Sequence, residues 1–134
     1  MPKLRHLAMV AEDIEKTASF YEQAFGMQRV RQHATAIGLS DGTVSLVIIS
    51  PDNMNVKGDN RRGLHHIGFL IEDMDEVAAK VEANGAVYHG QILGVGRGPT
   101  TERKYLDPNG VMFDITTAEH AHETWRINVE KETA

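Results

Sequence analysis

The sequence contains no cysteine, and this absence removes several kinds of chemistry. It excludes a disulfide framework, a thiol nucleophile and any metal site that depends on a cysteine ligand. Aromatic residues are also few, at 6% of the chain. That low content disfavours a binding groove lined mainly by aromatic rings.

Basic clusters and long apolar runs are scarce as well. The net charge is -5, and Arg61-Arg62 is the only basic cluster, which argues against a nucleic-acid partner. No apolar run is long enough to span a bilayer, and the N-terminus enters a strand-like run without a signal peptide. We therefore expect a cytoplasmic protein with no membrane partner.

The sequence contains an internal repeat at a fixed offset of 60 residues. His6 aligns with His66, and the apolar Leu7 and Met9 align with Ile67 and Phe69 without a gap. Further identities at the same offset are Glu12 with Glu72, Asp13 with Asp73, Ala18 with Ala78 and Glu22 with Glu82. Each copy therefore carries a histidine at the equivalent mid-strand position.

The 134 residues are enough for one domain with a substantial core. Apolar periodicity, helix caps and turn residues predict the order strand-helix-strand-strand-strand in each copy. This pattern predicts an α+β domain with a first module (3–50), a linker (51–63), a second module (64–117) and a polar C-terminal tail (118–134). The predicted strands are 3–11, 28–32, 34–39, 43–50, 64–71, 86–92, 101–106 and 111–117; the predicted helices follow Asp13 and Asp73 and end at Gly26 and about residue 84.

Two repeat-related histidines need a third partner to hold a metal ion. Aligning the turns Asp41-Gly42 and Asn109-Gly110 places Leu46 opposite Asp114. Asp114 interrupts an apolar strand, where a buried carboxylate would be costly without a cation. We therefore predict a divalent-metal site (Fe, Mn, Zn, Ni or Co) on His6, His66 and Asp114, with coordination positions left open for catalysis.

The remaining histidines are weaker candidates for ligands. Strand alternation sends His65 to the face opposite His66, and the repeat pairs it with Arg5. His120 and His122 could bind a cation, but the polar tail favours a solvated interpretation. His33 and His89 have no partner in the pattern.

Four segments in order carry a family resemblance over residues 3–117. They are Arg5-His6-Leu7, the helix end 20–27, the strand 64–69 and the turn and strand 105–114. With these segments the chain resembles the vicinal oxygen chelate superfamily, which includes glyoxalase I, extradiol dioxygenases, fosfomycin-resistance transferases and bleomycin-resistance proteins. The resemblance implies two βαβββ modules whose curved mixed sheets form a cup around one divalent metal. It also implies a small-molecule substrate and a homodimer, in which cups are shared between chains in many short members.

Departures from the family pattern narrow the expected site. Leu46 stands where glyoxalase I-like enzymes have a fourth ligand, so a four-ligand site is not expected. The two-His-one-Glu set of extradiol dioxygenases and fosfomycin transferases matches His6, His66 and Asp114, with a carboxylate one methylene shorter. Lys104 stands where those classes tend to have tyrosine, and Tyr105 would face the other way.

These features favour a metal-dependent enzyme acting on a small oxygen-rich substrate. An extradiol-type dioxygenase is the preferred interpretation. A glyoxalase-like lyase or isomerase, a thiol transferase of the fosfomycin-resistance type and a non-catalytic bleomycin-resistance-like binder are the alternatives. We expect Lys104 and Glu102 to be catalytic, because both share the strand parity of Asp114. Arg97 and Arg103 are expected to bind substrate if their loop folds over the cup.

Overall fold

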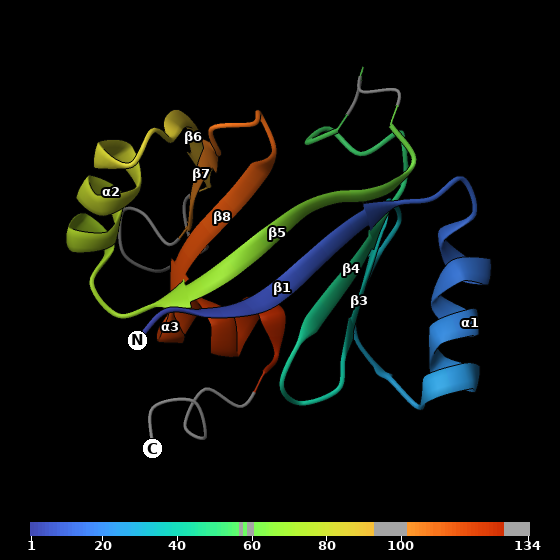
Figure 1. The fold of residues 1–134 in the computed structure, drawn as a ribbon. Helices are drawn as coiled ribbons and strands as arrows, with labels where there is room; N and C mark the ends of the chain where they lie inside the picture. The colour runs from blue at the N-terminus through green and yellow to red at the C-terminus, as the bar shows by residue number, and fades with distance from the viewer. Residues whose placement is uncertain (57, 59–60, 93–101, 128–134) are drawn as a thin grey trace. The chain divides into compact units, whose positions relative to one another are not determined.

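The computed structural model describes residues 1–56, 58, 61–92 and 102–127 (Figure 1). Two successive βαβββ modules confirm the predicted α+β fold. The first contains β1 (Lys3–Val10), α1 (Ile14–Phe25), β2 (Gln28–His33), β3 (Ala36–Ser40) and β4 (Ser45–Ile49). The second contains β5 (Gly63–Ile71), α2 (Met74–Ala83), β6 (Val87–Ile92), β7 (Glu102–Leu106) and β8 (Met112–Thr117).

The contacts divide the chain into two compact units, and the strands of each unit run in mixed directions. The His6 unit comprises His6–His65 with the residues from Trp125 onward, and its strand order is β2-β3-β4-β1. The Asp114 unit comprises Met1–Arg5 and His66–Thr124, and its order is β5-β8-β7-β6. In both units the first and last strands of a module pair in parallel, and the other pairs are antiparallel.

The helix boundaries agree with the signals in the sequence. The Asp13 side chain accepts a hydrogen bond from the Lys16 backbone N–H at 2.9 Å, and Asp73 caps α2 in the same way through Glu76 at 3.1 Å. Gly26 ends α1 with φ of 70°, a left-handed conformation that glycine adopts without steric cost.

Each unit buries its core between its helix and one face of its strands. Helix α1 packs on β3 and β4, and α2 packs on β8 (Figure 1). The repeat-related Ala18 and Ala78 are the buried residues of the two helices. They contact the cores formed by Ile37, Leu39, Leu46 and Ile48 in one unit and by Ile71, Tyr105, Phe113 and Ile115 in the other. The opposite strand faces therefore carry the side chains that do not belong to these two cores.

The C-terminal segment is partly buried, although its polar composition favoured a solvated tail. It forms a short helix α3 (Ala118–His120) and a π-helical turn η1 (Ala121–Trp125). His120 is 7% exposed and Trp125 is 2% exposed. The solvated interpretation of His120 is wrong because His120 meets Glu102 in the Asp114 unit. Within the described residues, no helix is both long and apolar enough to cross a membrane.

Candidate active site

One strand face of the Asp114 unit carries several of the titratable residues predicted from the sequence. Asp114 on β8 is the register partner of Gly68 on β5 and of Lys104 on β7. Side chains of register partners lie on the same face, so His66, two residues before Gly68, shares the face of Asp114. Phe113 and Ile115 alternate to the other face, where they pack under α2. We call this charged side the Asp114 face.

Asp114 is fully buried and contacts two basic side chains there. His66 Nε2 lies 3.1 Å from Asp114 Oδ2, and Lys104 Nζ donates a hydrogen bond to Oδ1 at 2.8 Å. Burial disfavours the ionised carboxyl, but the hydrogen bond and charge of His66 and the charge of Lys104 outweigh it. The pKa of Asp114 is therefore lower than usual. The carboxylate stays charged, as a metal ligand must.

The contacts continue from Lys104 to two further titratable groups. Lys104 Nζ lies 3.3 Å from Glu102 Oε2, and His120 Nε2 lies 3.3 Å from Glu102 Oε1. Burial alone would lower the pKa of Lys104, but the charges of Glu102 and Asp114 outweigh that effect and raise it. The Asp114 face thus holds an unbroken series of contacts among four buried residues and the partly buried Lys104, in the order His66, Asp114, Lys104, Glu102 and His120.

His6 is positioned by contacts within its own unit. Its Nδ1 lies 3.1 Å from the Ser45 hydroxyl, and its ring stacks on Trp125 with centroids 4.6 Å apart and planes 12° apart. In the tautomer whose Nδ1–H donates to Ser45, Nε2 carries the lone pair that can bind a metal. His6 therefore has the fixed orientation expected of a ligand.

The donor atoms fit a divalent cation. Two atoms that each lie about 2.1 Å from one ion are roughly 3.0 to 3.4 Å apart at octahedral or tetrahedral angles. The 3.1 Å between His66 Nε2 and Asp114 Oδ2 falls in that range. His6, His66 and Asp114 are all buried, and each offers one donor atom of a type that a divalent metal binds. Their nitrogen and oxygen donors suit Fe, Mn, Zn, Ni or Co alike.

The strand register corrects the alignment that identified Leu46 as the fourth position. Ala8 pairs with Val47 as Gly68 pairs with Asp114, so Val47 is the repeat equivalent of Asp114. Leu46 packs in the core under α1, on the face opposite His6. The turn alignment failed because the β7–β8 connection, 107–111, is one residue longer than the β3–β4 connection, 41–44. Val47 is apolar like Leu46, so the sequence still predicts no fourth ligand from β4.

The other predicted site residues lie apart from this cluster or outside the described residues. Arg103 alternates to the α2 face, where it pairs with Asp75 at 3.2 Å. Tyr105 faces the same side, as predicted, and donates a hydrogen bond to Glu82 at 3.2 Å. Arg97 lies outside the described residues.

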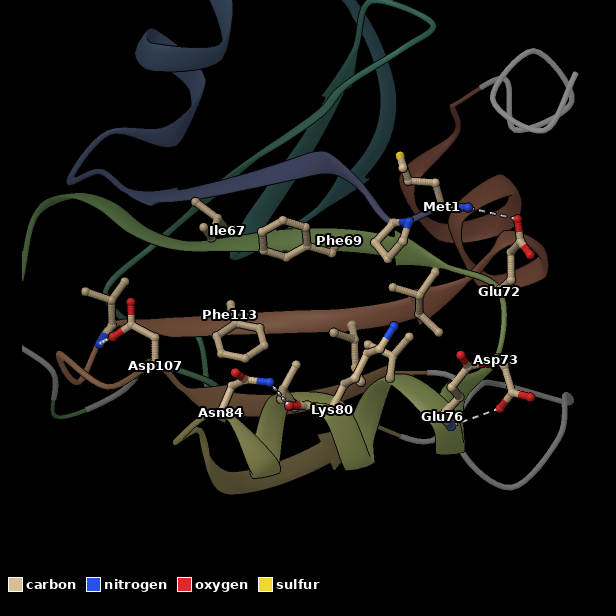
Figure 2. A pocket seen from close by; sticks show the side chains of 16 residues that line it. Met1, Ile67, Phe69, Glu72, Asp73, Glu76, Lys80, Asn84, Asp107 and Phe113 are labelled. Atoms are coloured by element: carbon tan, nitrogen blue, oxygen red, sulfur yellow. Dashed lines mark hydrogen bonds and ion pairs between the residues drawn. The ribbon is translucent and has the colours of Figure 1, made fainter.

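A groove of about 750 Å³ also lies on the α2 face of the Asp114 unit (Figure 2). Phe69 and Phe113 form part of its apolar lining, and Lys80 of α2 and the C-cap residue Asn84 line it as well. Neither His66 nor Asp114 lines it, because both side chains lie on the opposite face of their strands. The groove and the Asp114 face therefore lie on opposite faces of the same strands.

The chain matches a known protein family over most of its length. The family model described as the Glyoxalase/Bleomycin resistance protein/Dioxygenase superfamily matches residues 3–115. The chain belongs to this superfamily. The match confirms the resemblance inferred from the four sequence segments. Members of the superfamily are mostly metal-dependent enzymes that act on small molecules. No curated protein matches the chain.

Solved structures of the superfamily share the fold at low sequence identity. They include the Mn(II)-bound glyoxalase from Novosphingobium aromaticivorans, with a TM-score of 0.67 and 14% identity over 86% of this chain and 38% of that chain. Homoprotocatechuate 2,3-dioxygenase from Brevibacterium fuscum has a TM-score of 0.66 and 16% identity over 86% and 36%. Methylmalonyl-CoA epimerase from Mycobacterium tuberculosis has a TM-score of 0.65 and 14% identity over 98% and 91%. These likenesses establish the fold and leave the reaction to the site itself.

Proposed function

We propose that the protein is a divalent-metal-dependent enzyme in which His6, His66 and Asp114 bind the metal. Its substrate would be a small molecule that offers oxygen atoms to that metal. The observation that carries the proposal is the series of buried contacts on the Asp114 face. An ionised ligand touches a lysine, and that lysine touches a second carboxylate. Such clusters are typical of sites that bind cations and move protons.

The residues on the Asp114 face favour proton transfer as the reaction. A bound divalent metal would polarise a carbonyl or enolate oxygen of the substrate and so acidify the neighbouring C–H bond. Lys104 is a partly buried cation that would offset negative charge on the substrate. Glu102 is the carboxylate that would accept and return the proton. An isomerase, epimerase or lyase reaction next to a carbonyl uses all of these groups.

An extradiol-type dioxygenase is the second candidate. It is supported by the donor set, because two histidines and one carboxylate with open positions suit Fe(II) and O₂ chemistry. In a dioxygenase, Glu102 and Lys104 would contribute less to catalysis, because O₂ activation depends first on the metal.

Metal analysis tests the shared part of both candidates. The purified protein should bind one transition-metal ion per chain, and His66→Ala should lose most of it. The matched control is His122→Ala, because His122 is exposed and lies outside the proposed ligand set. A wild-type protein that binds no metal, or a His66→Ala variant that keeps its full complement, would refute the metal site.

Isotope exchange separates the two reactions. In D₂O, the metal-loaded protein should exchange the hydrogen next to the carbonyl in a panel of small oxoacids and acyl thioesters, as measured by proton NMR. Glu102→Gln should abolish that exchange while metal content stays unchanged. If the Fe(II)-loaded protein instead consumes O₂ with catechols and exchanges no hydrogen, the dioxygenase candidate replaces the first.

A further inference from the structure

The C-terminal segment 118–127 lies beyond the residues that match the superfamily, which end at 115. Its polar composition concealed a buried side. His120, Ala121, Trp125 and Ile127 are all less than 9% exposed, whereas His122 is exposed. The segment 118–127 is therefore packed against the rest of the chain, although it lies outside the family match.

Trp125 contacts the proposed ligand His6 directly. The two rings stack with centroids 4.6 Å apart and an interplanar angle of 12°. Stacking holds the plane of the imidazole, and the Ser45 hydroxyl at 3.1 Å from Nδ1 sets its rotation within that plane. Together these contacts fix the direction in which His6 Nε2 points.

Residues before and after Trp125 in this segment also make polar contacts. His120 lies 3.3 Å from Glu102 within the Asp114 unit. Within the His6 unit, the Ser40 hydroxyl donates a hydrogen bond to the Arg126 carbonyl at 3.1 Å. Trp125 is thus held by its neighbours in the chain as well as by burial.

We infer that Trp125 is a positioning residue for the metal ligand His6. The inference rests on the proposed metal site and adds the C-terminal segment to it. Groups that orient a ligating histidine raise metal affinity, because the free site then already has the bound geometry. The stacked indole supplies this orientation through a residue that the family match does not include.

Cobalt binding to the full chain tests the inference. Co²⁺ affinity and its visible absorption spectrum would be measured for the wild type, Trp125→Leu and Trp125→Phe. Trp125→Leu should weaken Co²⁺ binding about 10-fold or more and alter the spectrum, because the imidazole is no longer held in plane. Trp125→Phe should restore most of the affinity, since a phenyl ring can still stack. Circular dichroism would verify that each variant is folded.

Two controls lie in the same segment. Ile127→Ala removes buried volume but leaves the stacked rings, and His122→Leu changes an exposed residue. Both should bind Co²⁺ nearly as the wild type does. If Ile127→Ala weakens Co²⁺ binding as much as Trp125→Leu does, or if folded Trp125→Leu binds Co²⁺ with unchanged affinity and spectrum, the inference is overturned.

A measurement on the wild type decides the case if Trp125→Leu does not fold. Trp125 is the only tryptophan in the chain, so its emission reports on this one site. Co²⁺ should quench that emission with the same affinity that the visible absorption gives. Unquenched emission at full Co²⁺ occupancy would overturn the inference about Trp125 but not the proposed metal site. A wild-type protein that binds no Co²⁺ would refute the proposed metal site itself.

Discussion

At the scale of single residues, Asp114 explains why its neighbours are charged. A carboxylate that is completely buried needs compensation, and His66 and Lys104 supply it at 3.1 and 2.8 Å. Lys104 also contacts Glu102, so one ammonium group stands between two carboxylates. This arrangement keeps Asp114 ionised and ready to bind a cation, and it keeps a second carboxylate close to the same place.

Removing the ammonium of Lys104 should destabilise the metal-free protein. Lys104→Met leaves Asp114 and Glu102 facing each other without the shared cation, which should lower the free energy of unfolding by about 3 kcal/mol near neutral pH. Urea denaturation measures this change. Lys80→Met is the matched control, since Lys80 is exposed on α2.

The free energy of unfolding should also depend on pH through the ionisation of Lys104. The pKa of Lys104 is higher in the folded protein than in the unfolded chain. Its contribution is therefore complete below the unfolded value of about 10.4 and is lost as the pH rises through the folded value. Urea midpoints between pH 9 and 12 should fall more steeply for the wild type than for Lys104→Met. Parallel curves would show that the Lys104 contacts do not stabilise the fold.

At the scale of strands, register decides which side chains reach the site. Val47 occupies on β4 the place that Asp114 occupies on β8, and Leu46 belongs to the core under α1. A shift of one residue in the alignment moves a side chain to the opposite face of its strand. The two positions can therefore be told apart by the same substitution at each.

Aspartate at these two neighbouring positions should have opposite effects. Val47→Asp adds a carboxylate on the face of His6 and should tighten Co²⁺ binding by supplying a fourth ligand. Leu46→Asp places a charge in the α1 core and should destabilise the protein by about 4 kcal/mol or more. Cobalt titration and urea denaturation measure the two effects. Tighter binding by Leu46→Asp, with stability unchanged, would show that the turn alignment was right after all.

The sequence predicted the parts of the fold that depend on local signals. Asp13, Asp73 and Gly26 mark helix ends through their own side chains or backbone freedom, and the repeat placed His6 and His66 on equivalent strands. It missed the contact of His120 with Glu102, because a polar tail gives no sign of which residue will be buried. The turn alignment also assigned the fourth ligand position to Leu46 instead of Val47. Two turns of different length cannot show which residues of the following strands are equivalent.

At the scale of the whole molecule, metal binding should couple the ligands of the two units. His6 belongs to one unit, and His66 and Asp114 belong to the other. An ion held by all three would stabilise the native state by about 2.7 kcal/mol at a free concentration 100 times its dissociation constant. For a domain of this size that corresponds to a rise in melting temperature of roughly 10 °C.

Thermal denaturation with and without a chelator tests whether all three ligands act together. The wild type should lose the roughly 10 °C increment when the metal is removed, and adding Co²⁺ back should restore it. His66→Ala and His6→Ala should show no increment at the same Co²⁺ concentration, because each leaves only two protein ligands. His122→Ala should behave as the wild type. If His6→Ala keeps the full increment while His66→Ala loses it, the metal is held by the Asp114 unit alone and the three-ligand site is wrong.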